Sequence, residues 1–426
     1  MPAKSISNYR WTIVVLLFFA TTINYIDRQV IGLLKPFLEK NFFPTESDYS
    51  SIVMAFQASY AIGLLFFGKL VDKIGSKKGY SISVIIWSVA AMLHAFVKST
   101  FGFGAARVIL GFGESGNFPS SIKAVAEWFP KKERALATGI FNAGTNIGAV
   151  IAPIIVPLIL SLWGWQDAFL VTGALGFVWL IFWLLIYQIP AKKKDLSKTE
   201  FDFIHSDVDD VNENEINKTS WLKLFSVKQT WAFISGKFLT DPIWWFMLFW
   251  LPSYFSSTFK LDLTHPGWPL VIIYSCASVG SVGGGYLSSF LIRKGATPYA
   301  ARKKTMLIFA LLVLPLLAAK FITNMWMAVA LLSIATAAHQ AWSANMYTTA
   351  SDYFPKKMLS SVIGIGGMAG AVGGIIFPKI VGSILDHFNA LGNKTAGYNI
   401  IFVICAFAYL IAWLLMHFFS KSSVKN

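Results

Sequence analysis

Long apolar stretches separated by polar connections repeat from one end of the chain to the other. A helix that crosses a hydrocarbon core of about 30 Å needs roughly 20 predominantly apolar residues. Twelve stretches approach this length, and the pattern therefore predicts an all-α membrane protein with twelve transmembrane helices. They lie near residues 11–35, 51–71, 80–98, 101–125, 135–160, 167–189, 229–257, 268–291, 305–321, 324–350, 360–385 and 398–420.

One polar connection, residues 191–228, is much longer than the others. It carries the basic run Lys192-Lys193-Lys194 and then an acidic stretch from Asp207 to Glu215. We interpret it as a cytoplasmic linker between two pseudo-symmetric six-helix bundles. The predicted domains are an N-terminal bundle at 1–190, the linker at 191–228 and a C-terminal bundle at 229–426.

Composition supports a membrane protein, because 55% of the 426 residues are hydrophobic and only 13% are charged. Soluble proteins carry about 25% charged residues. The net charge of +15 is high enough for nucleic-acid binding, but most of the 36 Lys and Arg lie on the N-terminus, the even-numbered connections and the C-terminus. By the positive-inside rule this distribution predicts two cytoplasmic termini and a lipid bilayer as partner, not nucleic acid.

The first apolar stretch could instead be a cleavable signal peptide. It is long, retains Asp27 and Arg28, and is followed by no small-residue cleavage site, so we interpret it as a transmembrane helix. The short connection between the first two spans favours a bacterial inner membrane over a eukaryotic one.

The sequence also matches itself when it is displaced by 225 residues. This shift places Phe129-Pro130-Lys131-Lys132 on Phe354-Pro355-Lys356-Lys357, Gly139 on Gly364, Gly148 on Gly373, Pro153 on Pro378 and Glu114 on His339. Such a repeat predicts two halves with the same membrane orientation, as in transporters whose halves rock around a central site.

Four ionisable residues interrupt the apolar spans: Asp27, Arg28, Arg107 and Glu114. A charge at bilayer depth costs about 2.5–3.5 kcal/mol on insertion scales, so such residues usually face a bundle interior or a water-filled pathway. Arg107 and Glu114 are seven positions apart, about 700° around a helix and about 10 Å along it, and hence share a face. We expect Arg28 to point toward a substrate and Asp27 toward Arg107.

The charges of this quartet sum to zero, and this suggests how transport could be coupled. An anion bound to Arg28 would leave an uncompensated charge, which protonation of a carboxylate would remove. Binding of substrate and proton would then favour each other. We predict that Asp27 and Glu114 carry protons, that Arg107 senses the charge of Asp27, and that Arg28 binds a substrate carboxylate. The alternative is a structural ion-pair network that locks two helices together.

Polar and aromatic side chains on the same spans suit a sugar acid, whose remaining groups are hydroxyls and a ring face. Besides Arg28 and Glu114, the predicted substrate-binding residues are Tyr25, Tyr60, Asn142, Asn146, His339, Gln340 and Ser343. His339 has a packing role as its alternative. Trp244, Trp245 and Trp342 could stack on the sugar, although core packing is the alternative for each.

Two further sets of residues are interpreted as structural. Lys237 and Asp241 lie four residues apart and are expected to form a local ion pair, with a proton relay as the alternative. Glycines on the fifth and eleventh spans are expected to permit close helix packing: Gly139, Gly144, Gly148, Gly364, Gly370 and Gly373.

The run from Gly68 to Lys78 resembles the G-x-x-x-D-R-x-G-R-R/K signature of the major facilitator superfamily, with Lys73 in place of the usual arginine. The resemblance implies a conformational gate at Gly68, Asp72, Lys73, Gly75 and Lys77. The equivalent signature between the eighth and ninth spans is degraded, because Ser288-Ser289 precede Arg293-Lys294-Gly295 without an acid. The two gates are therefore not expected to be equivalent.

Other segments resemble the anion:cation symporter branch of that superfamily. They are Asn24 to Arg28, the run from Arg107 to Pro130, the stretch from Phe238 to Pro242, and Ala338 to Ala341, of which the last two are similar to hexuronate transporters. The resemblance implies proton-coupled symport of an organic anion by a monomer. The alternatives are sodium coupling, and phosphate, an aldonate or a sialic acid as substrate.

Several classes of chemistry lack their motifs. The chain has no H-E-x-x-H, no P-loop and no Cys/His cluster with metal-ligand spacing. We therefore expect no enzyme, no ATP-driven pump, no metal and no cofactor. The coupling ion expected from the charged quartet is H⁺. Cys276 and Cys405 lie within predicted spans and are interpreted as packing residues. A transporter-like membrane sensor remains as an alternative, and it would bind its ligand without accumulating it.

Overall fold

The computed structural model describes residues 8–206, 224–354 and 356–420, and this part of the chain contains helices and no strand. The acidic stretch predicted within the linker, Asp207 to Glu215, lies outside the described residues. The predicted all-α class is confirmed.

Ten helical elements lie within residues 8–206. They are α1 (Tyr9–Phe42), α2 (Glu46–Ile74), α3 (Ser76–Leu93), the 3₁₀ turn η1 (His94–Phe96), α4 (Thr100–Glu114), α5 (Asn117–Trp128), α6 (Lys131–Trp163), α7 (Trp165–Ile186), η2 (Pro190–Lys192) and α8 (Lys198–Ile204).

Seven elements follow in the remainder of the described chain. They are α11 (Lys228–Phe259), α12 (Trp268–Arg293), α13 (Pro298–Val313), η3 (Leu314–Phe321), α14 (Met325–Tyr353), α15 (Lys356–Ala390) and α16 (Lys394–Ser420).

Each predicted span corresponds to a helical segment. The fourth is divided into α4 and α5 at Ser115 and Gly116, the third ends in η1, and the ninth continues from α13 into η3. Among the described residues, nine helices are long and apolar enough by themselves to cross a membrane. Large apolar side chains such as Leu185, Val282 and Phe418 are mostly exposed on these helices. Helices that expose this much apolar surface fit a lipid environment.

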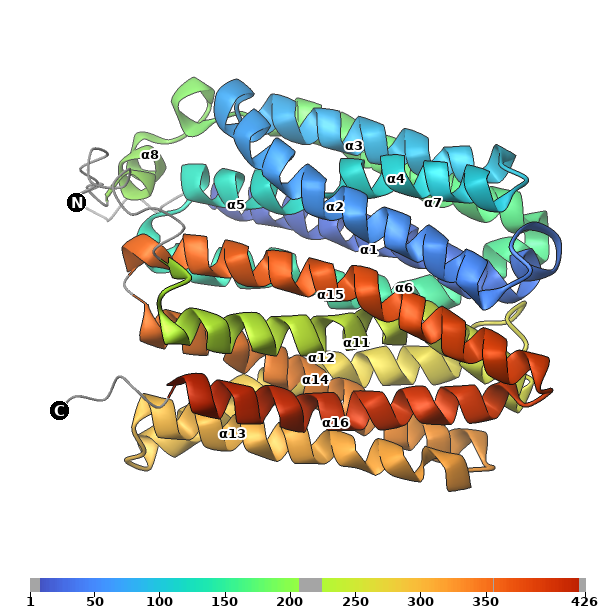
Figure 1. Cartoon of the computed structure of the whole chain (residues 1–426). Coiled ribbons are helices and arrows are strands. Elements are labelled where there is room, and N and C mark those ends of the chain that lie inside the picture. Colours follow the sequence, from blue (N-terminus) through green and yellow to red (C-terminus); the bar gives the residue numbers. More distant parts are fainter. Residues whose placement is uncertain (1–7, 207–223, 355, 421–426) are drawn as a thin grey trace. The chain divides into compact units, whose positions relative to one another are not determined.

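The chain divides into two compact units. The first comprises Met1–Leu34 and Ala55–Val211, and the second comprises Lys35–Met54 and Asn212–Asn426. In the first, α3 packs against α4 and α7; in the second, α12 packs on α14, and α11 on α15 and α16 (Figure 1). The segment 35–54 belongs to the second unit, so α1 and α2 each run from one unit into the other. The domain limits predicted at 190 and 228 stay a prediction.

Aromatic side chains fill the core of the first unit. Trp179 stacks on Trp183 at 5.2 Å between ring centroids, and Trp183 stacks on Tyr187 at 3.9 Å. Tyr80 lies edge-on to Trp183 at 5.1 Å. These rings anchor α3 to α7 at the end where the predicted gate lies.

The predicted close packing at glycines is found at several positions. A Cβ atom at Gly144 would lie 2.5 Å from the carbonyl oxygen of Phe18, and one at Gly148 would lie 2.6 Å from that of Thr22, so α6 touches the backbone of α1. In the second unit, Gly373 approaches the carbonyl of Phe238 in the same way. The prediction was wrong for Gly139, because no described atom lies within 4 Å of its Cβ position.

Candidate functional site

A buried ion pair joins α1 and α4 in the first unit. Arg28 Nη2 lies 2.7 Å from Glu114 Oε2, and Arg28 Nε donates to the same oxygen at 2.8 Å. Arg28 Nη2 also donates to Asn24 Oδ1 at 3.4 Å. Both charged side chains are almost completely excluded from solvent. A buried charge is tolerated only when it is paired and hydrogen-bonded. Here each residue is the oppositely charged, hydrogen-bonded partner of the other.

Three aromatic rings enclose the guanidinium of Arg28. Its Cζ atom lies 4.8 Å from the ring centroid of Tyr25, 4.9 Å from that of Tyr60 and 5.1 Å from that of Phe56. The ring faces attract the cation electrostatically. Tyr25 and Tyr60 were predicted at this site, whereas Phe56 was missed because an apolar residue in an apolar span carries no distinguishing signal.

Arg107 also reaches this cluster from α4. Its Nη2 donates to the carbonyl oxygen of Arg28 at 3.1 Å, and its Cζ lies 5.5 Å from the Phe56 centroid. The helical spacing thus correctly predicted that Arg107 and Glu114 would face the same region.

Asp27 is buried beside these residues. Within the described part of the chain its two carboxylate oxygens accept no hydrogen bond, while Arg107 and Glu114 are close enough to act electrostatically on its charge. The expected orientation of Asp27 toward Arg107 stays a prediction. A buried carboxylate that accepts no hydrogen bond is costly to keep ionised, which favours a change in its protonation.

Two further predicted residues lie on α6 of the same unit. Asn142 is exposed, and Asn146, one helical turn later, is half-buried. Both lie on a helix that contacts α1 through Gly144 and Gly148.

The predicted gate residues form the turn between α2 and α3. Gly75 has a φ of 86°, a left-handed conformation that favours glycine. Lys123 Nζ donates to Asp72 Oδ1 and to the carbonyl of Val71, both at 3.0 Å, and thereby links α5 to the end of α2. Lys77 Nζ donates to the carbonyl of Leu184 on α7 at 2.8 Å.

The remaining predicted gate residues differ in their surroundings. Lys73 is exposed and, with Lys77, lines a surface cavity of about 760 Å³. Gly68 has no described atom within 4 Å of its Cβ position, so its role in the gate stays a prediction.

In the second unit, His339 on α14 is surrounded by aromatic rings. Its Nδ1 lies 2.6 Å from the hydroxyl of Tyr409, and its ring stacks on Trp244 with centroids 5.3 Å apart. Trp342 packs edge-on against Tyr409 at 5.6 Å. These contacts favour the packing alternative for Trp244 and Trp342. Gln340 and Ser343, on the same helix, are half-buried.

The local ion pair predicted on α11 is present. Lys237 Nζ lies 2.7 Å from Asp241 Oδ2 and donates to the hydroxyl of Tyr347 at 3.1 Å. Gly370 on α15 allows this arrangement, because a Cβ there would lie 2.4 Å from the same Asp241 oxygen.

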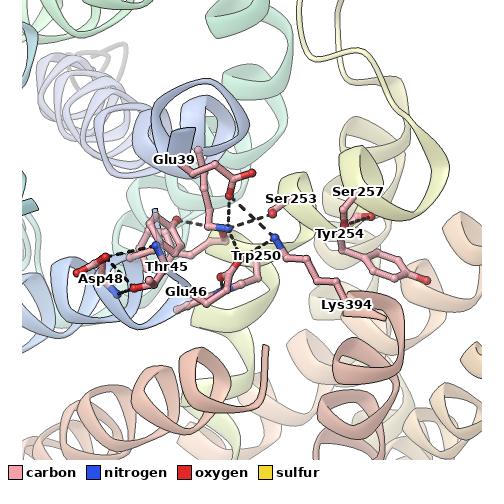
Figure 2. Close-up of polar contacts among 12 residues, drawn as sticks. Glu39, Thr45, Glu46, Asp48, Trp250, Ser253, Tyr254, Ser257 and Lys394 are labelled. Carbon is pink, nitrogen blue, oxygen red and sulfur yellow. Dashed lines mark hydrogen bonds and ion pairs between the residues drawn. The ribbon is translucent and has the colours of Figure 1, made fainter. Parts of the chain in front are cut away.

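A second buried charge cluster was not predicted. Figure 2 shows Glu39, Glu46 and Lys394 of this cluster, all of which belong to the second unit. Lys35 completes it, because its Nζ lies 3.0 Å from Glu39 Oε2 and 2.6 Å from Glu46 Oε1. Sequence reasoning missed it because Lys35, Glu39 and Glu46 lie at the ends of predicted spans, where charges are ordinarily hydrated. In the described residues, no group of His, Cys, Asp and Glu has a metal-binding arrangement.

Apolar helices that bury an arginine–glutamate pair are typical of membrane transporters. The model of the Major Facilitator Superfamily matches residues 17–378, and the chain belongs to this superfamily. It is thus a multi-pass integral membrane transporter and not an enzyme.

Individual relatives agree with this membership. The chain is similar to the hexuronate transporter of Escherichia coli, with 29% identity over 415 residues that cover 97% of this chain and 94% of the relative. The galacturonate transporter of Dickeya chrysanthemi is 31% identical over 284 residues, which cover 66% of this chain and 82% of the relative.

The fold has a counterpart among solved structures. A bacterial homologue of the human lysosomal transporter Spinster, in an inward-facing and unoccupied conformation, superposes with a TM-score of 0.80. The two sequences are 18% identical, and the match covers 98% of this chain and 99% of that one. This likeness confirms the fold that the twelve spans predicted.

Proposed function

We propose that this transporter carries a hexuronate or a related sugar acid together with protons, by alternating access. The buried pair of Arg28 and Glu114 is the observation that carries the proposal, because it holds a carboxylate-binding group and a proton acceptor in direct contact. The names of the relatives support the substrate class, since they include hexuronate, galacturonate and D-galactonate transporters.

Exchange of Glu114 for a substrate carboxylate at Arg28 couples substrate binding to proton binding. A planar guanidinium binds a carboxylate through two parallel hydrogen bonds, so a substrate carboxylate competes with Glu114 for the same donors. Once displaced, the Glu114 carboxylate is a buried charge without its partner, and protonation relieves that cost. Substrate and proton then stabilise each other's binding by the same free energy.

Asp27 supplies a second proton site in this proposal. Its buried carboxylate lies in the field of both Glu114 and Arg107, so its charge responds to any change at Glu114. Arg107 is the group through which that charge is sensed, because it also holds the backbone of Arg28.

The rings of Tyr25 and Tyr60 lie against the guanidinium of Arg28, and their hydroxyls are proposed to bind sugar hydroxyls beside a carboxylate held by Arg28. Asn142 and Asn146 are proposed to do the same from α6. His339, Gln340 and Ser343 are also proposed to bind the substrate. Gly68, Asp72, Lys73, Gly75 and Lys77 are the proposed conformational gate.

The proposal includes a bacterial inner membrane, two cytoplasmic termini and a monomer, as the charge distribution and the superfamily suggest. It needs no cofactor and uses H⁺ as its coupling ion. Sodium coupling and other anions, namely phosphate, an aldonate or a sialic acid, are the alternatives.

Uptake of radiolabelled glucuronate into proteoliposomes tests the proposal directly. With a pH gradient that is acidic outside, in sodium-free buffer, we expect accumulation that collapses when a protonophore is added. Binding without accumulation would indicate a sensor. Accumulation that requires sodium, or that occurs with phosphate and not with sugar acids, would replace the proposal with the corresponding alternative.

A further inference from the structure

Positive charge gathers in the second unit where α12 ends and α13 begins. Arg293 and Lys294 lie at the end of α12, and Arg302, Lys303 and Lys304 lie in the first two turns of α13. These two helices contain no Asp or Glu, and α16, which packs against α13, contains none either. Five cations therefore lie on helices that supply no carboxylate of their own.

One of the five is directed toward the protein itself, because Arg302 Nη1 donates to the hydroxyl of Ser288 on α12. The other four form no ion pair within the described part of the chain: Arg293, Lys294, Lys303 and Lys304. Three of these side chains are exposed, and that of Lys303 is half-buried. Like charges this close together repel each other, so an anion from outside the chain would be bound favourably here.

Two aromatic residues hold Lys303 between α13 and α16. Its Nζ lies 5.2 Å from the ring centroid of Tyr299 and 5.8 Å from that of Trp413, and it donates to the Tyr299 hydroxyl at 3.3 Å. Trp413 Nε1 donates to the carbonyl of Lys303 at 3.0 Å, and the hydroxyls of Tyr299 and Ser420 lie 3.1 Å apart. Tyr and Trp concentrate at the level of lipid headgroups, so these contacts place the lysine at headgroup depth.

Exposed apolar side chains continue from this end along both helices, which lie side by side (Figure 1). On α13, Ile308 and Leu311 follow Lys304 on the same face and are 38% and 48% exposed. The exposed row on α16 has helical spacing: Phe407, Ile411, Leu414 and Phe418. This row is about 16 Å long, close to half of a hydrocarbon core of about 30 Å.

We propose that Lys303 and Lys304, with Arg293 and Lys294 at the adjoining end of α12, bind the phosphate of an anionic phospholipid whose acyl chains lie along α13 and α16. Basic clusters between transmembrane helices bind anionic headgroups in this way. A zwitterionic lipid suits the cluster less, because its own cationic group offsets its phosphate. The site is independent of the substrate and the coupling ion of the proposed function, so either proposal can fail without the other.

The test compares two lipids that differ in net charge. Native mass spectrometry of the purified full-length protein measures Kd for phosphatidylglycerol and for phosphatidylcholine with the same acyl chains. The site variant combines Lys303→Gln with Lys304→Gln. The control combines Lys98→Gln with Lys320→Gln, which removes the same charge from two exposed lysines elsewhere in the chain. Lys320 is matched further, because it lies at the other end of the α13–η3 span and its Nζ is 4.7 Å from the Phe321 centroid.

We expect the parent to bind phosphatidylglycerol more tightly than phosphatidylcholine. In the site variant the Kd for phosphatidylglycerol should rise about tenfold or more, because each basic residue near the headgroups adds to the attraction of an anionic lipid. Its Kd for phosphatidylcholine should stay at the parent value, and the control should bind both lipids as the parent does. If the double variant does not purify as a monodisperse protein, Lys304→Gln compared with Lys320→Gln decides, since both lysines are exposed.

Three results would overturn the proposal. The first is a parent that does not prefer phosphatidylglycerol, and the second is an equal rise of Kd in the site variant and the control. The third concerns a soluble anion with the same chemistry, inorganic phosphate, whose binding is followed by phosphorus NMR. Phosphate binding that is lost in the site variant, together with phosphatidylglycerol binding that is retained, would assign these lysines to a soluble anion.

Discussion

Arg28 on α1 directs both Nε and Nη2 of its guanidinium to a single carboxylate oxygen, Oε2 of Glu114 at the end of α4. The other oxygen, Oε1, has no hydrogen-bond partner within the described residues. The pair is therefore asymmetric. One oxygen is occupied by the arginine, and the other can receive a proton without breaking a described hydrogen bond.

Glu114→Gln should uncouple glucuronate transport from proton transport. The glutamine fills the same volume but cannot be charged, so we expect proton-driven accumulation of glucuronate to fall at least tenfold while exchange of internal for external glucuronate continues. Exchange by the variant should also depend less on pH, with Asp27 as the remaining proton site. Proton-driven accumulation at the parent level would contradict the role of Glu114.

Arg28→Lys should weaken substrate binding although the charge is retained. A lysine cannot make the two parallel hydrogen bonds of a guanidinium, and the loss of one charge-assisted bond, about 1.5–3 kcal/mol, corresponds to at least a tenfold rise in Kd. Equilibrium binding of glucuronate to purified protein measures it. Arg293→Lys, at an exposed position near the end of α12, is the matched control and should bind normally.

The hydrophobic pattern alone predicted the fold, because spans of about 20 apolar residues are a direct consequence of bilayer thickness. It did not predict the break at Ser115 and Gly116, which depends on tertiary contacts: a Cβ at Gly116 would lie 2.6 Å from both Phe67 and Ser83. Helix periodicity brought Arg107 and Glu114 together correctly.

Pairing of charges between helices was harder to predict than their position along one helix. Asp27 and Arg28 are neighbours in sequence, and which of them meets Glu114 depends on how α1 is rotated against α4. Periodicity within a single helix does not determine that rotation. The burial of Lys35 was missed for a different reason. Whether this lysine is hydrated or buried depends on contacts such as that with Ser253, which is more than 200 positions away.

Asp27→Asn should leave the protein as stable as the parent or more stable, since it removes a buried charge that accepts no hydrogen bond within the described part of the chain. The gain should be largest at pH 8, where the carboxylate is most often ionised, and should disappear in acid, where the parent carboxyl is protonated. Thermal unfolding of both proteins from pH 5 to pH 8 measures it, and a gain of about 1 kcal/mol would raise Tm by about 1 °C in a chain of this length. A lower Tm at pH 8 would show that the charge is stabilising.

Alanine substitutions at Gly144 and Gly139 should have opposite effects on stability. At Gly144 the added methyl would lie 2.5 Å from the carbonyl oxygen of Phe18, so α6 would have to move away from α1, at a cost of about 1–3 kcal/mol. At Gly139 no described atom lies within 4 Å, and alanine should stabilise the helix by about 0.5–1 kcal/mol. Thermal unfolding in detergent compares the two directly, and equal shifts would contradict the packing assigned to Gly144.

Glu200→Gln should destabilise the first unit through the short helix α8. Glu200 is fully buried, and its Oε1 accepts from the backbone N–H of Arg10 at 3.1 Å and from Nη1 at 3.3 Å. Glutamine keeps an acceptor there but removes the charge, while Glu133, 2.9 Å from Arg10 Nε, remains as a charged partner.

Removing one partner of a buried pair costs about 3–5 kcal/mol, and the remaining glutamate should reduce this to about 2 kcal/mol. Glu133→Gln is the matched comparison, because its side chain is 24% exposed and an exposed pair contributes about 1 kcal/mol or less. Thermal unfolding should therefore show a clearly larger fall in Tm for Glu200→Gln than for Glu133→Gln. Equal falls would mean that burial of Glu200 adds nothing to the attachment of α8.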